Sequence, residues 1–369
     1  MERTVLHDWH QAHNGRMVDF AGWSMPVQYS SIVEEHTAVR ERVGLFDISH
    51  MGRLEFQGPD AVRFLDHLLT NEVSTLQPGQ VRYSLVCRED GGILDDVLVY
   101  RVEQSLAGDP THLLVVNASN RLKILQWIES QKAGFDVAVI DRTGPWAMIA
   151  LQGPKACELM ASYGTPDPAP HKYYTCWKGQ TPHGPAIVSR TGYTGEDGVE
   201  LMLPVETAQA VWNDLMSRGQ PLGILPCGLG CRDTLRLEAA MPLYGHELSE
   251  QIDPLTAGLQ FAVKLTKPFI GQQRLAEIAA SPLDRTRVGL ALEGRRIARE
   301  HTPVKVGSDV VGEVTSGTFS PTLQKTIAMA CVSKAHSAIG TPLEVDLRGK
   351  LERATVVPLP FYKRPRAAR

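Results

Sequence analysis

Two adjacent carboxylates interrupt an apolar run near the end of the first hundred residues. Asp95 and Asp96 lie within Ile93-Leu94-Asp95-Asp96-Val97-Leu98-Val99-Tyr100. In a strand, alternation directs Asp95 to one face and Asp96 to the other, and both faces are otherwise apolar. A buried carboxylate costs several kcal/mol unless it is paired or hydrogen-bonded, so strand interiors rarely carry one without a function. The alternative is that the strand begins after Asp96 and both acids lie in a loop.

Two glycine-rich segments further along the chain also carry polar residues. The nine residues Gly192–Glu200 include three glycines, which let a backbone approach a ligand closely, although an ordinary turn has the same composition. Gly230 precedes a predicted helix with Arg232, Arg236 and Glu238. These charges either pair along the helix or bind an acidic group of a ligand.

Other catalytic and metal-binding patterns are absent from the sequence. It has no phosphate-binding loop, nucleophile elbow or dinucleotide fingerprint. Of six cysteines only Cys227 and Cys231 are close together, without zinc-binding partners nearby, so we expect neither metal nor disulfides. His7, His10 and His13 recur at every third residue, and we expect an exposed polar helix face there.

The acidic segment is predicted to be the second strand of a hairpin. Strands over 81–87 and 93–102 flank Asp90-Gly91-Gly92, which is typical of a hairpin turn. A strand over 111–116 follows, and then a helix that Ser119 or Asn120 caps. The apolar residues of this helix are Leu122, Leu125 and Ile128. A further helix is predicted over 205–217.

The sequence Gln-Gly-Pro-x-Ala occurs twice, at 57–61 and 152–156, each time after an apolar strand. In both copies the glycine ends the strand and the proline starts a helix. The buried helix positions are Ala61, Phe64, Leu65 and Leu68 after the first copy and Leu159 and Met160 after the second. Two such units predict one pseudo-symmetric α+β domain of the split βαβ type.

The pattern changes near residue 285. Short β-rich runs at 288–292, 304–306 and 326–332 alternate with Gly and Pro turns, which predicts an all-β sandwich or barrel after a linker at 281–287. The 369 residues, 43% hydrophobic with a net charge of −3, suit two or three globular domains and predict neither nucleic-acid nor membrane binding. Without a signal or transit peptide, we expect a cytoplasmic protein.

Six motifs occur together in order along the chain. They are Phe46-Asp-Ile-Ser-His-Met-Gly52, Gly91-Gly-Ile-Leu-Asp-Asp96, Gly192-Tyr-Thr-Gly-Glu196, Gly228-Leu-Gly-Cys-Arg-Asp-Thr-Leu-Arg-Leu-Glu238, Thr315-Ser-Gly-Thr-Phe-Ser-Pro321 and Pro360-Phe-Tyr-Lys-Arg364. Each is weak alone, but together they closely resemble the aminomethyltransferase T-protein family of the glycine cleavage system, from about Leu6 to Arg364.

The resemblance implies a three-domain α+β fold around a central hole that binds tetrahydrofolate, the co-substrate. An N-terminal domain made of separated segments and a ferredoxin-like split βαβ domain are expected, interleaved, in 1–285. A C-terminal β-barrel of jelly-roll type is expected in 286–369.

The resemblance also implies the site residues, position by position. Asp96 matches the central acidic residue near the reacting folate nitrogens, because related folate-dependent demethylase domains keep an acid at this second position. Glu200 matches the carboxylate that accepts hydrogen bonds from the N–H donors of the pterin. The other implied folate contacts are Arg232, Tyr83, Met51, Asn117, Tyr193 and Tyr362.

The implied reaction transfers the aminomethyl carbon from the lipoyl arm of H-protein to tetrahydrofolate, giving 5,10-methylenetetrahydrofolate and ammonia. Positive charge develops at the transferred carbon, and Asp96 is suited to stabilise it and to accept or relay a proton. No metal or flavin is implied. Lipoylated H-protein is the implied partner of a monomer, and the P- and L-proteins of the system take part indirectly.

Two other functions fit parts of the pattern. A folate-dependent demethylase domain usually accompanies a flavin-binding oxidase module, for which 369 residues leave no room. A non-catalytic folate-binding scaffold of iron–sulfur assembly has the same fold without the complete set of acids and arginine. Asp96, Glu200 and Arg232 together favour the enzyme.

Overall fold

The computed structural model describes residues 1–103, 106 and 111–365. These fall into two compact units, each built from separated stretches of chain. The first unit comprises Met1–Ser84 and Asp96–Arg232, and the second comprises Leu85–Asp95 and Asp233–Arg369.

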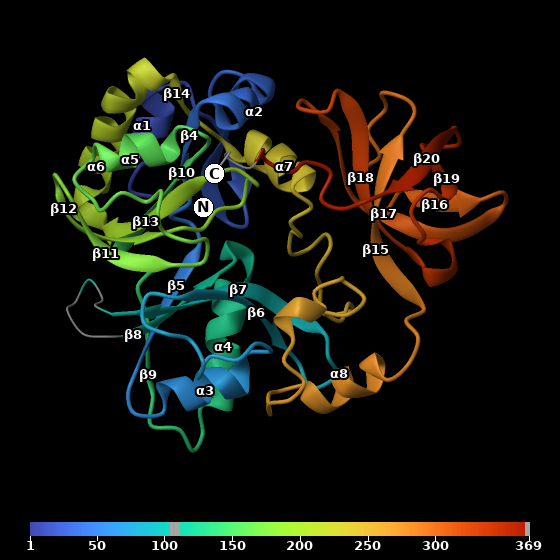
Figure 1. Cartoon of the computed structure of the whole chain (residues 1–369), viewed down its shortest axis with the longest axis horizontal. Helices are drawn as coiled ribbons and strands as arrows, with labels where there is room; N and C mark the ends of the chain where they lie inside the picture. Colours follow the sequence, from blue (N-terminus) through green and yellow to red (C-terminus); the bar gives the residue numbers. More distant parts are fainter. Residues whose placement is uncertain (104–105, 107–110, 366–369) are drawn as a thin grey trace. The chain divides into compact units, whose positions relative to one another are not determined.

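A five-stranded sheet of order β6-β7-β8-β5-β9 carries the acidic segment (Figure 1). In chain order its elements are β5 (Gly52–Gln57), α3 (Ala61–Leu68), β6 (Val81–Cys87), β7 (Ile93–Val102), β8 (Thr111–Val116), α4 (Arg121–Gln131) and β9 (Ala138–Asp141). The run β5-α3-β7-β8-α4-β9 is the expected split βαβ arrangement, with β6 added at the edge. The tip of the β6–β7 hairpin groups with the second unit.

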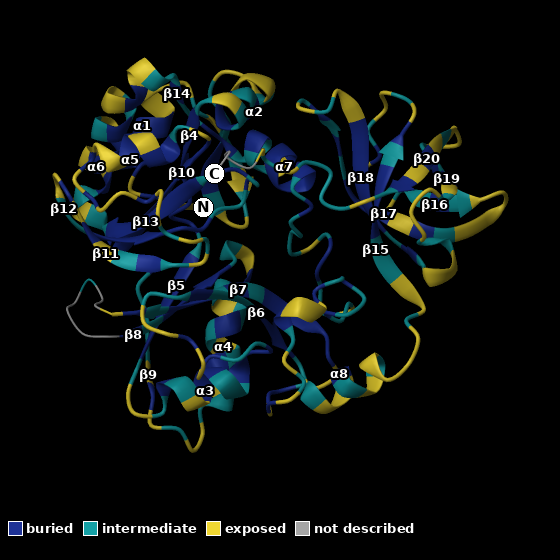
Figure 2. Ribbon diagram, viewed as in Figure 1, coloured by how far each residue is buried: buried dark blue, intermediate teal, exposed yellow. Residues whose placement is uncertain are grey.

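A second sheet of order β11-β12-β13-β10-β4-β14 encloses the largest core of the first unit. Its strands are β4 (Val43–Asp47), β10 (Trp146–Gln152), β11 (Cys176–Thr181), β12 (Gly184–Ser189), β13 (Gly198–Pro204) and β14 (Ile224–Pro226). The helices of this region are α1 (His7–Ala12), α2 (Ile32–Glu41), α5 (Ala156–Ala161) and α6 (Val205–Gly219). Trp212 of α6 belongs to the same core as Leu45, Ile149 and Leu201 from three strands, and the buried strands stand out in Figure 2.

A small sheet of order β1-β3-β2 precedes these elements. Its strands are β1 (Glu2–Arg3), β2 (Arg16–Phe20) and β3 (Trp23–Gln28). It includes the parallel pair β1–β3 and the antiparallel pair β2–β3.

The second unit contains a closed antiparallel barrel, β15-β18-β17-β16-β19-β20. Its strands are β15 (Arg285–Leu292), β16 (Pro303–Val306), β17 (Asp309–Ser320), β18 (Lys325–Ser333), β19 (Pro342–Asp346) and β20 (Leu351–Val357). The barrel core includes Leu290, Val304 and Ala330. The unit also holds α8 (Gln272–Ala279) and most of α7 (Leu229–Glu238), which begins in the first unit.

The prediction of a single pseudo-symmetric domain from the Gln-Gly-Pro repeat is wrong. The two copies lie in different sheets, at the β5–α3 and β10–α5 junctions. Each copy lies at the first strand–helix junction of a series of strand, helix, three strands, helix and strand. The repeat therefore marks two similar series of elements, each with its own sheet. They differ because β4 is inserted between β10 and β14, and sequence similarity at one junction cannot reveal an insertion made elsewhere in the chain.

Most of the predicted elements are confirmed, including β6, β7 and β8 at their expected bounds. For α4, Asn120 at the N-cap position and the burial of Ile128 are confirmed, but the capping bond and the burial of Leu122 are not. The side chain of Asn120 makes no capping hydrogen bond, and Leu122 is 65% exposed, whereas Ile124 and Ile128 are buried. The linker is shorter than expected because β15 already begins at Arg285. None of the described helices is long and apolar enough to cross a membrane.

Candidate functional site

Both acids of the segment lie within β7, which excludes the loop alternative. Asp95 is fully buried on one face of the strand, and Asp96 lies on the other face, partly exposed. Leu98 and Tyr100 share the face of Asp96 because side chains alternate along a strand. The strand therefore gives the two neighbouring carboxylates different surroundings.

Two neutral donors hold the Asp96 carboxylate. Tyr83 on β6 donates its hydroxyl to Oδ2 over 3.0 Å, and Asn117, just after β8, donates Nδ2 to Oδ1 over 2.8 Å. Burial raises the pKa of Asp96 to about 6, although these hydrogen bonds act in the opposite direction. No cation compensates the charge in this set of contacts, so the group gains and loses a proton near neutral pH.

The sheet register brings Met51 to the same end of the sheet. Gly52 pairs with Val116 and Leu98 pairs with Val115, so continuing the two ladders places Met51 and Asp96 on either side of Asn117. Four residues predicted to line the site, namely Tyr83, Asp96, Asn117 and Met51, thus come from neighbouring strands or their ends. All four side chains are partly exposed.

Glu200 is the second carboxylate of the site and lies on β13, 6% exposed. Thr191 donates its hydroxyl to Oε2 over 2.5 Å. No described residue hydrogen-bonds Oε1. Burial raises the pKa of Glu200, while the bond from Thr191 and the charge of Arg232 lower it. A buried carboxylate with one unpaired oxygen is suited to accept an N–H donor from a ligand.

Arg232, on the first turns of α7, connects several of the predicted residues. Its guanidinium lies 4.8 Å from the centre of the Tyr193 ring, in a cation–π contact. Burial, followed by the charge of Arg232, lowers the pKa of His50 to about 3, so His50 is neutral beside this cation. His50 belongs to one of the six motifs, but the sequence analysis did not identify it as a site residue. Only the structure shows that it is 2% exposed and that its Nδ1 has no hydrogen-bond partner among the described residues.

The two carboxylates belong to facing parts of the first unit. Tyr100 is fully buried, and its pKa is raised by burial and then by the charge of Glu200. The face of β7 that carries Asp96 is therefore directed toward Glu200. Asp96 lies four residues before Tyr100, about 13 Å along a strand, so the two acids are separated along this face.

Several side chains hold the Gly-rich loop between β12 and β13. Gln152, from the second repeat, donates Nε2 to the carbonyls of Thr191 and Val199 and accepts from Thr194. A Cβ at Gly192 would lie 2.1 Å from Gln152 Oε1, so only glycine allows this approach.

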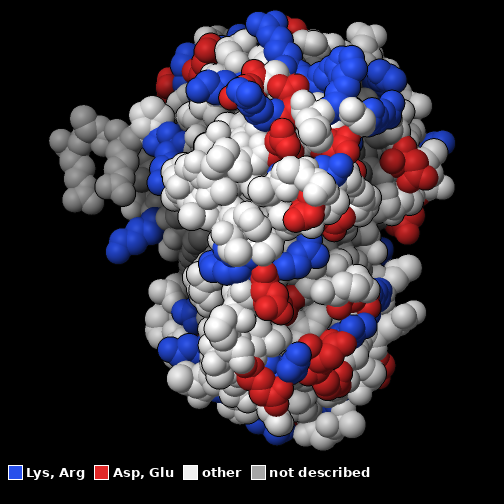
Figure 3. All heavy atoms as spheres, turned by 90° about the vertical axis from the view of Figure 1, so that its right-hand side faces the viewer, with Lys and Arg blue, Asp and Glu red and all other residues white. Residues whose placement is uncertain are grey.

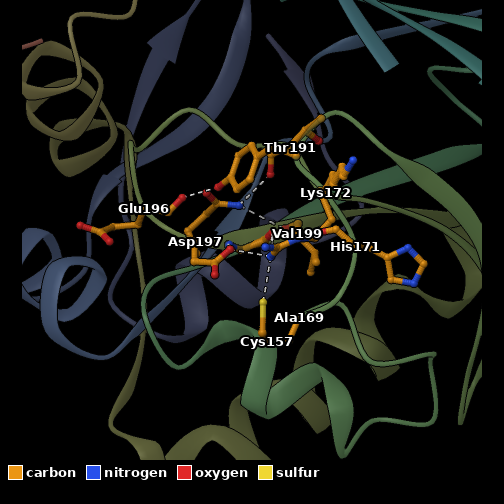
Figure 4. A network of polar contacts seen from close by, with 12 residues as sticks. Cys157, Ala169, His171, Lys172, Thr191, Glu196, Asp197 and Val199 are labelled. Atoms are coloured by element: carbon orange, nitrogen blue, oxygen red, sulfur yellow. Dashed lines mark hydrogen bonds and ion pairs between the residues drawn. The ribbon is translucent and has the colours of Figure 1, made fainter. Parts of the chain in front are cut away.

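Arg190 fixes the far end of this loop. It contacts Asp197 at 2.5 Å, the Gly198 carbonyl at 3.0 Å and the sulfur of Cys157 at 2.8 Å, in the network drawn in Figure 4. The loop that carries Tyr193 is thus held at both ends.

Tyr362 lies in the second unit, where its backbone N–H donates to the carbonyl of Glu238. Its contact with folate stays a prediction. The sequence left open whether Arg236 and Glu238 pair within the protein or bind a ligand. Both side chains are buried, and both make hydrogen bonds within the second unit. Arg236 binds Glu247 and Ser316, and Glu238 accepts from Thr322.

The prediction of an exposed face for the N-terminal histidines is confirmed for His13 and wrong for His7 and His10. His7 and His10 are buried, and His10 Nε2 lies 2.9 Å from Asp47 Oδ2. The partner is 37 residues away, and periodicity within the helix cannot identify it. Within the described residues there is no group of three or more His, Cys, Asp or Glu side chains that could hold a metal.

Comparisons with known proteins cover nearly the whole chain. The GCVT N-terminal domain model matches residues 6–267, and the glycine cleavage T-protein C-terminal barrel domain model matches residues 285–363. Proteins named aminomethyltransferase from Symbiobacterium thermophilum and Streptomyces coelicolor are each 48% identical over 99% of this chain and 98% of their own length. The crystal structure of the glycine cleavage system aminomethyltransferase T from Bartonella henselae is 33% identical, covers 98% of both chains and has a TM-score of 0.89.

These matches first define the class, which is that of the aminomethyltransferases. The chain belongs to the glycine cleavage T-protein family. The α+β fold with a C-terminal barrel, expected from the motifs, is thereby confirmed.

Proposed function

We propose that this protein transfers the aminomethyl carbon from the lipoyl arm of H-protein to tetrahydrofolate, giving 5,10-methylenetetrahydrofolate and ammonia. The similarity to named aminomethyltransferases over 99% of the chain carries this proposal. The partly exposed Asp96 and the buried Glu200, neither with a direct salt bridge to a described residue, support it from the site.

The residues of the first unit fit tetrahydrofolate. Glu200 Oε1 has no hydrogen bond from a described residue and is suited to accept from the pterin ring, while Tyr193 and Arg232 offer flat surfaces beside it. Asp96, Asn117, Tyr83 and Met51 would line the reacting end. Bound tetrahydrofolate supplies the nucleophilic nitrogens that receive the one-carbon unit.

Asp96 acts as the acid–base and electrostatic group in this proposal. With a pKa of about 6 it is mostly ionised at pH 7, so it can balance positive charge at the transferred carbon. The same value allows it to hold or release a proton near neutral pH. Tyr83 and Asn117 fix the direction of its oxygens without neutralising them.

Lipoylated H-protein is the proposed partner, and the P- and L-proteins of the system take part indirectly. Lys/Arg and Asp/Glu side chains are intermixed on the face in Figure 3, so charge attraction of H-protein there would act locally. A monomeric state and a cytoplasmic location stay predictions.

The direct test is ammonia release from aminomethylated H-protein, with and without tetrahydrofolate. We expect rapid release that requires folate and yields one methylenetetrahydrofolate per ammonia. H-protein without the lipoyl group is the control and should give no product. Folate binding without any acceleration of release would instead indicate the non-catalytic scaffold.

A further inference from the structure

The hydroxyl of Thr191 lies at the centre of a buried polar chain behind Glu200. It donates to Glu200 Oε2 over 2.5 Å, and Ser189 Oγ lies 2.7 Å away on its other side. Ser189 is the cross-strand partner of Glu200 in the β12–β13 register, and all three residues are buried. The chain of contacts thus runs from the end of β12 through the start of the Gly-rich loop to β13.

Ser189 Oγ has two acceptors within reach, the Thr191 hydroxyl at 2.7 Å and the Glu200 backbone carbonyl at 3.4 Å, and the shorter contact fits an ionised Glu200. An ionised Glu200 only accepts hydrogen bonds, so Thr191 gives it its single proton and accepts a proton from Ser189. Hydrogen bonds aligned in this way strengthen one another, and a bond to an ionised acceptor is stronger than a neutral one. Gln152 holds the Thr191 carbonyl over 3.1 Å and so fixes the residue from its backbone side.

We propose that Thr191 is a positioning residue that keeps Glu200 an ionised, oriented carboxylate with Oε1 directed to the ligand. Among the described residues, Thr191 provides the one hydrogen bond that either oxygen of this carboxylate receives. The inference rests on the proposed function, because the ligand that it serves is the N–H donor edge of a pterin.

Three charged or titratable groups face Glu200 from the elements around it. They are Arg232 on α7, Tyr100 on β7 and Tyr174 just before β11. Of these, Arg232 favours the ionised form, as Thr191 does, while burial opposes it. Without the Thr191 hydroxyl, Glu200 should therefore take up a proton at a higher pH than in the native protein.

The test compares Thr191→Val, which keeps the shape and removes the donor, with Thr191→Ser, which keeps the donor. At pH 7, Thr191→Val should weaken tetrahydrofolate binding about ten-fold. The pH at which binding is half lost on acidification should rise by about one unit. Thr191→Ser should restore both values. Calorimetric titration of the full chain between pH 5 and 8 measures them.

Thr194→Val is the matched control. Thr194 is also buried in the loop, but its hydroxyl donates to Gln152 Oε1 over 2.9 Å rather than to Glu200. Its substitution removes a hydroxyl from the same loop, so any loss of folate affinity that comes only from a less ordered loop also occurs in this variant. The pH midpoint of folate binding should stay at the native value in this variant.

A second readout needs no folate. Carbon-13 NMR of labelled glutamate carboxyls, with Glu200 assigned by its loss in Glu200→Gln, follows the titration in the ligand-free protein. If Thr191→Val titrates Glu200 as the native protein does, the positioning role is overturned even where Glu200→Gln weakens folate binding. If Thr191→Val shifts this titration but neither Thr191→Val nor Glu200→Gln changes folate affinity, the positioning role stands and the proposed pterin site fails.

Discussion

Asp47, which is buried, and Asp96, which is partly exposed, are two carboxylates of the same unit with opposite properties. Burial alone would raise the pKa of Asp47, but His10, Thr4 and Ser49 surround it with a charge and hydrogen bonds that lower it to about 2. Asp96 receives only two neutral donors from side chains, and burial raises its pKa to about 6. Partners, rather than residue type, separate the two.

The difference separates a structural acid from a reactive one. Asp47 joins the N-terminal segment to the end of β4, and its side chain and that of His10 are both 0% exposed. Asp96 keeps one side open and titrates within the physiological range. The two acids also act on stability with opposite signs. Ionised Asp47 contributes stability that is present above about pH 4 and is lost as the pH falls toward 2. Protonated Asp96 contributes stability that is present below about pH 4 and is lost as the pH rises through 6.

The largest expected effect follows from Asp96→Asn. Single-turnover formation of methylenetetrahydrofolate should slow by about 10² to 10⁴, because asparagine can neither balance a positive charge nor take a proton. Folate affinity should change little. Stability at pH 7 should not fall, since the ionised carboxylate is itself unfavourable there. A native turnover rate in this variant would make Asp96 a structural residue like Asp47.

The converse variant, Asp47→Asn, should affect stability instead of turnover. It leaves His10 and Thr4 facing an uncharged amide in a buried site, which should lower the free energy of unfolding by about 3 kcal/mol. Urea unfolding measures this change, and turnover per folded molecule at saturating folate should remain native. Equal loss of turnover in both aspartate variants would remove the distinction between them.

Glu200→Gln sharpens the comparison at the binding end of the site. An amide must present an NH₂ group where the carboxylate offers an acceptor, so tetrahydrofolate should bind roughly ten- to a hundred-fold more weakly. The chemical step at saturating folate should be affected less. An unchanged Kd would mean that the pterin does not contact Glu200.

A smaller effect is expected for Tyr83→Phe. It removes one donor from the Asp96 carboxylate, so the pKa of Asp96 should rise further above its present value. At pH 7 the rate should fall only a few-fold, and the midpoint of the pH–rate profile should move to higher pH. The matching change near the other acid, Tyr29→Phe, removes a hydroxyl 2.8 Å from His10 Nδ1 and should leave the pH–rate profile unchanged.

The sequence predicted the Asp96 region well because local rules govern it. Alternation and a glycine turn define β6 and β7, and a charged residue on an apolar strand is visible in the sequence itself. Asp47 gave no such signal, because its partner His10 comes from a separate helix. The residues that hold the Glu200 carboxylate were missed for the same reason. Ser189 is an ordinary residue until the β12–β13 register pairs it with Glu200, and Thr191 until the loop after β12 brings its hydroxyl to the Glu200 carboxylate.

The role of Asp96 is tested most directly by the pH dependence of single-turnover methylenetetrahydrofolate formation at saturating folate. In the native protein the rate should rise with pH around a midpoint of about 6, because the ionised carboxylate is the active form. In Asp96→Asn it should be low and without that step, while Asp47→Asn keeps the native profile. A midpoint near 6 that persists in Asp96→Asn would contradict the assignment of the reactive acid.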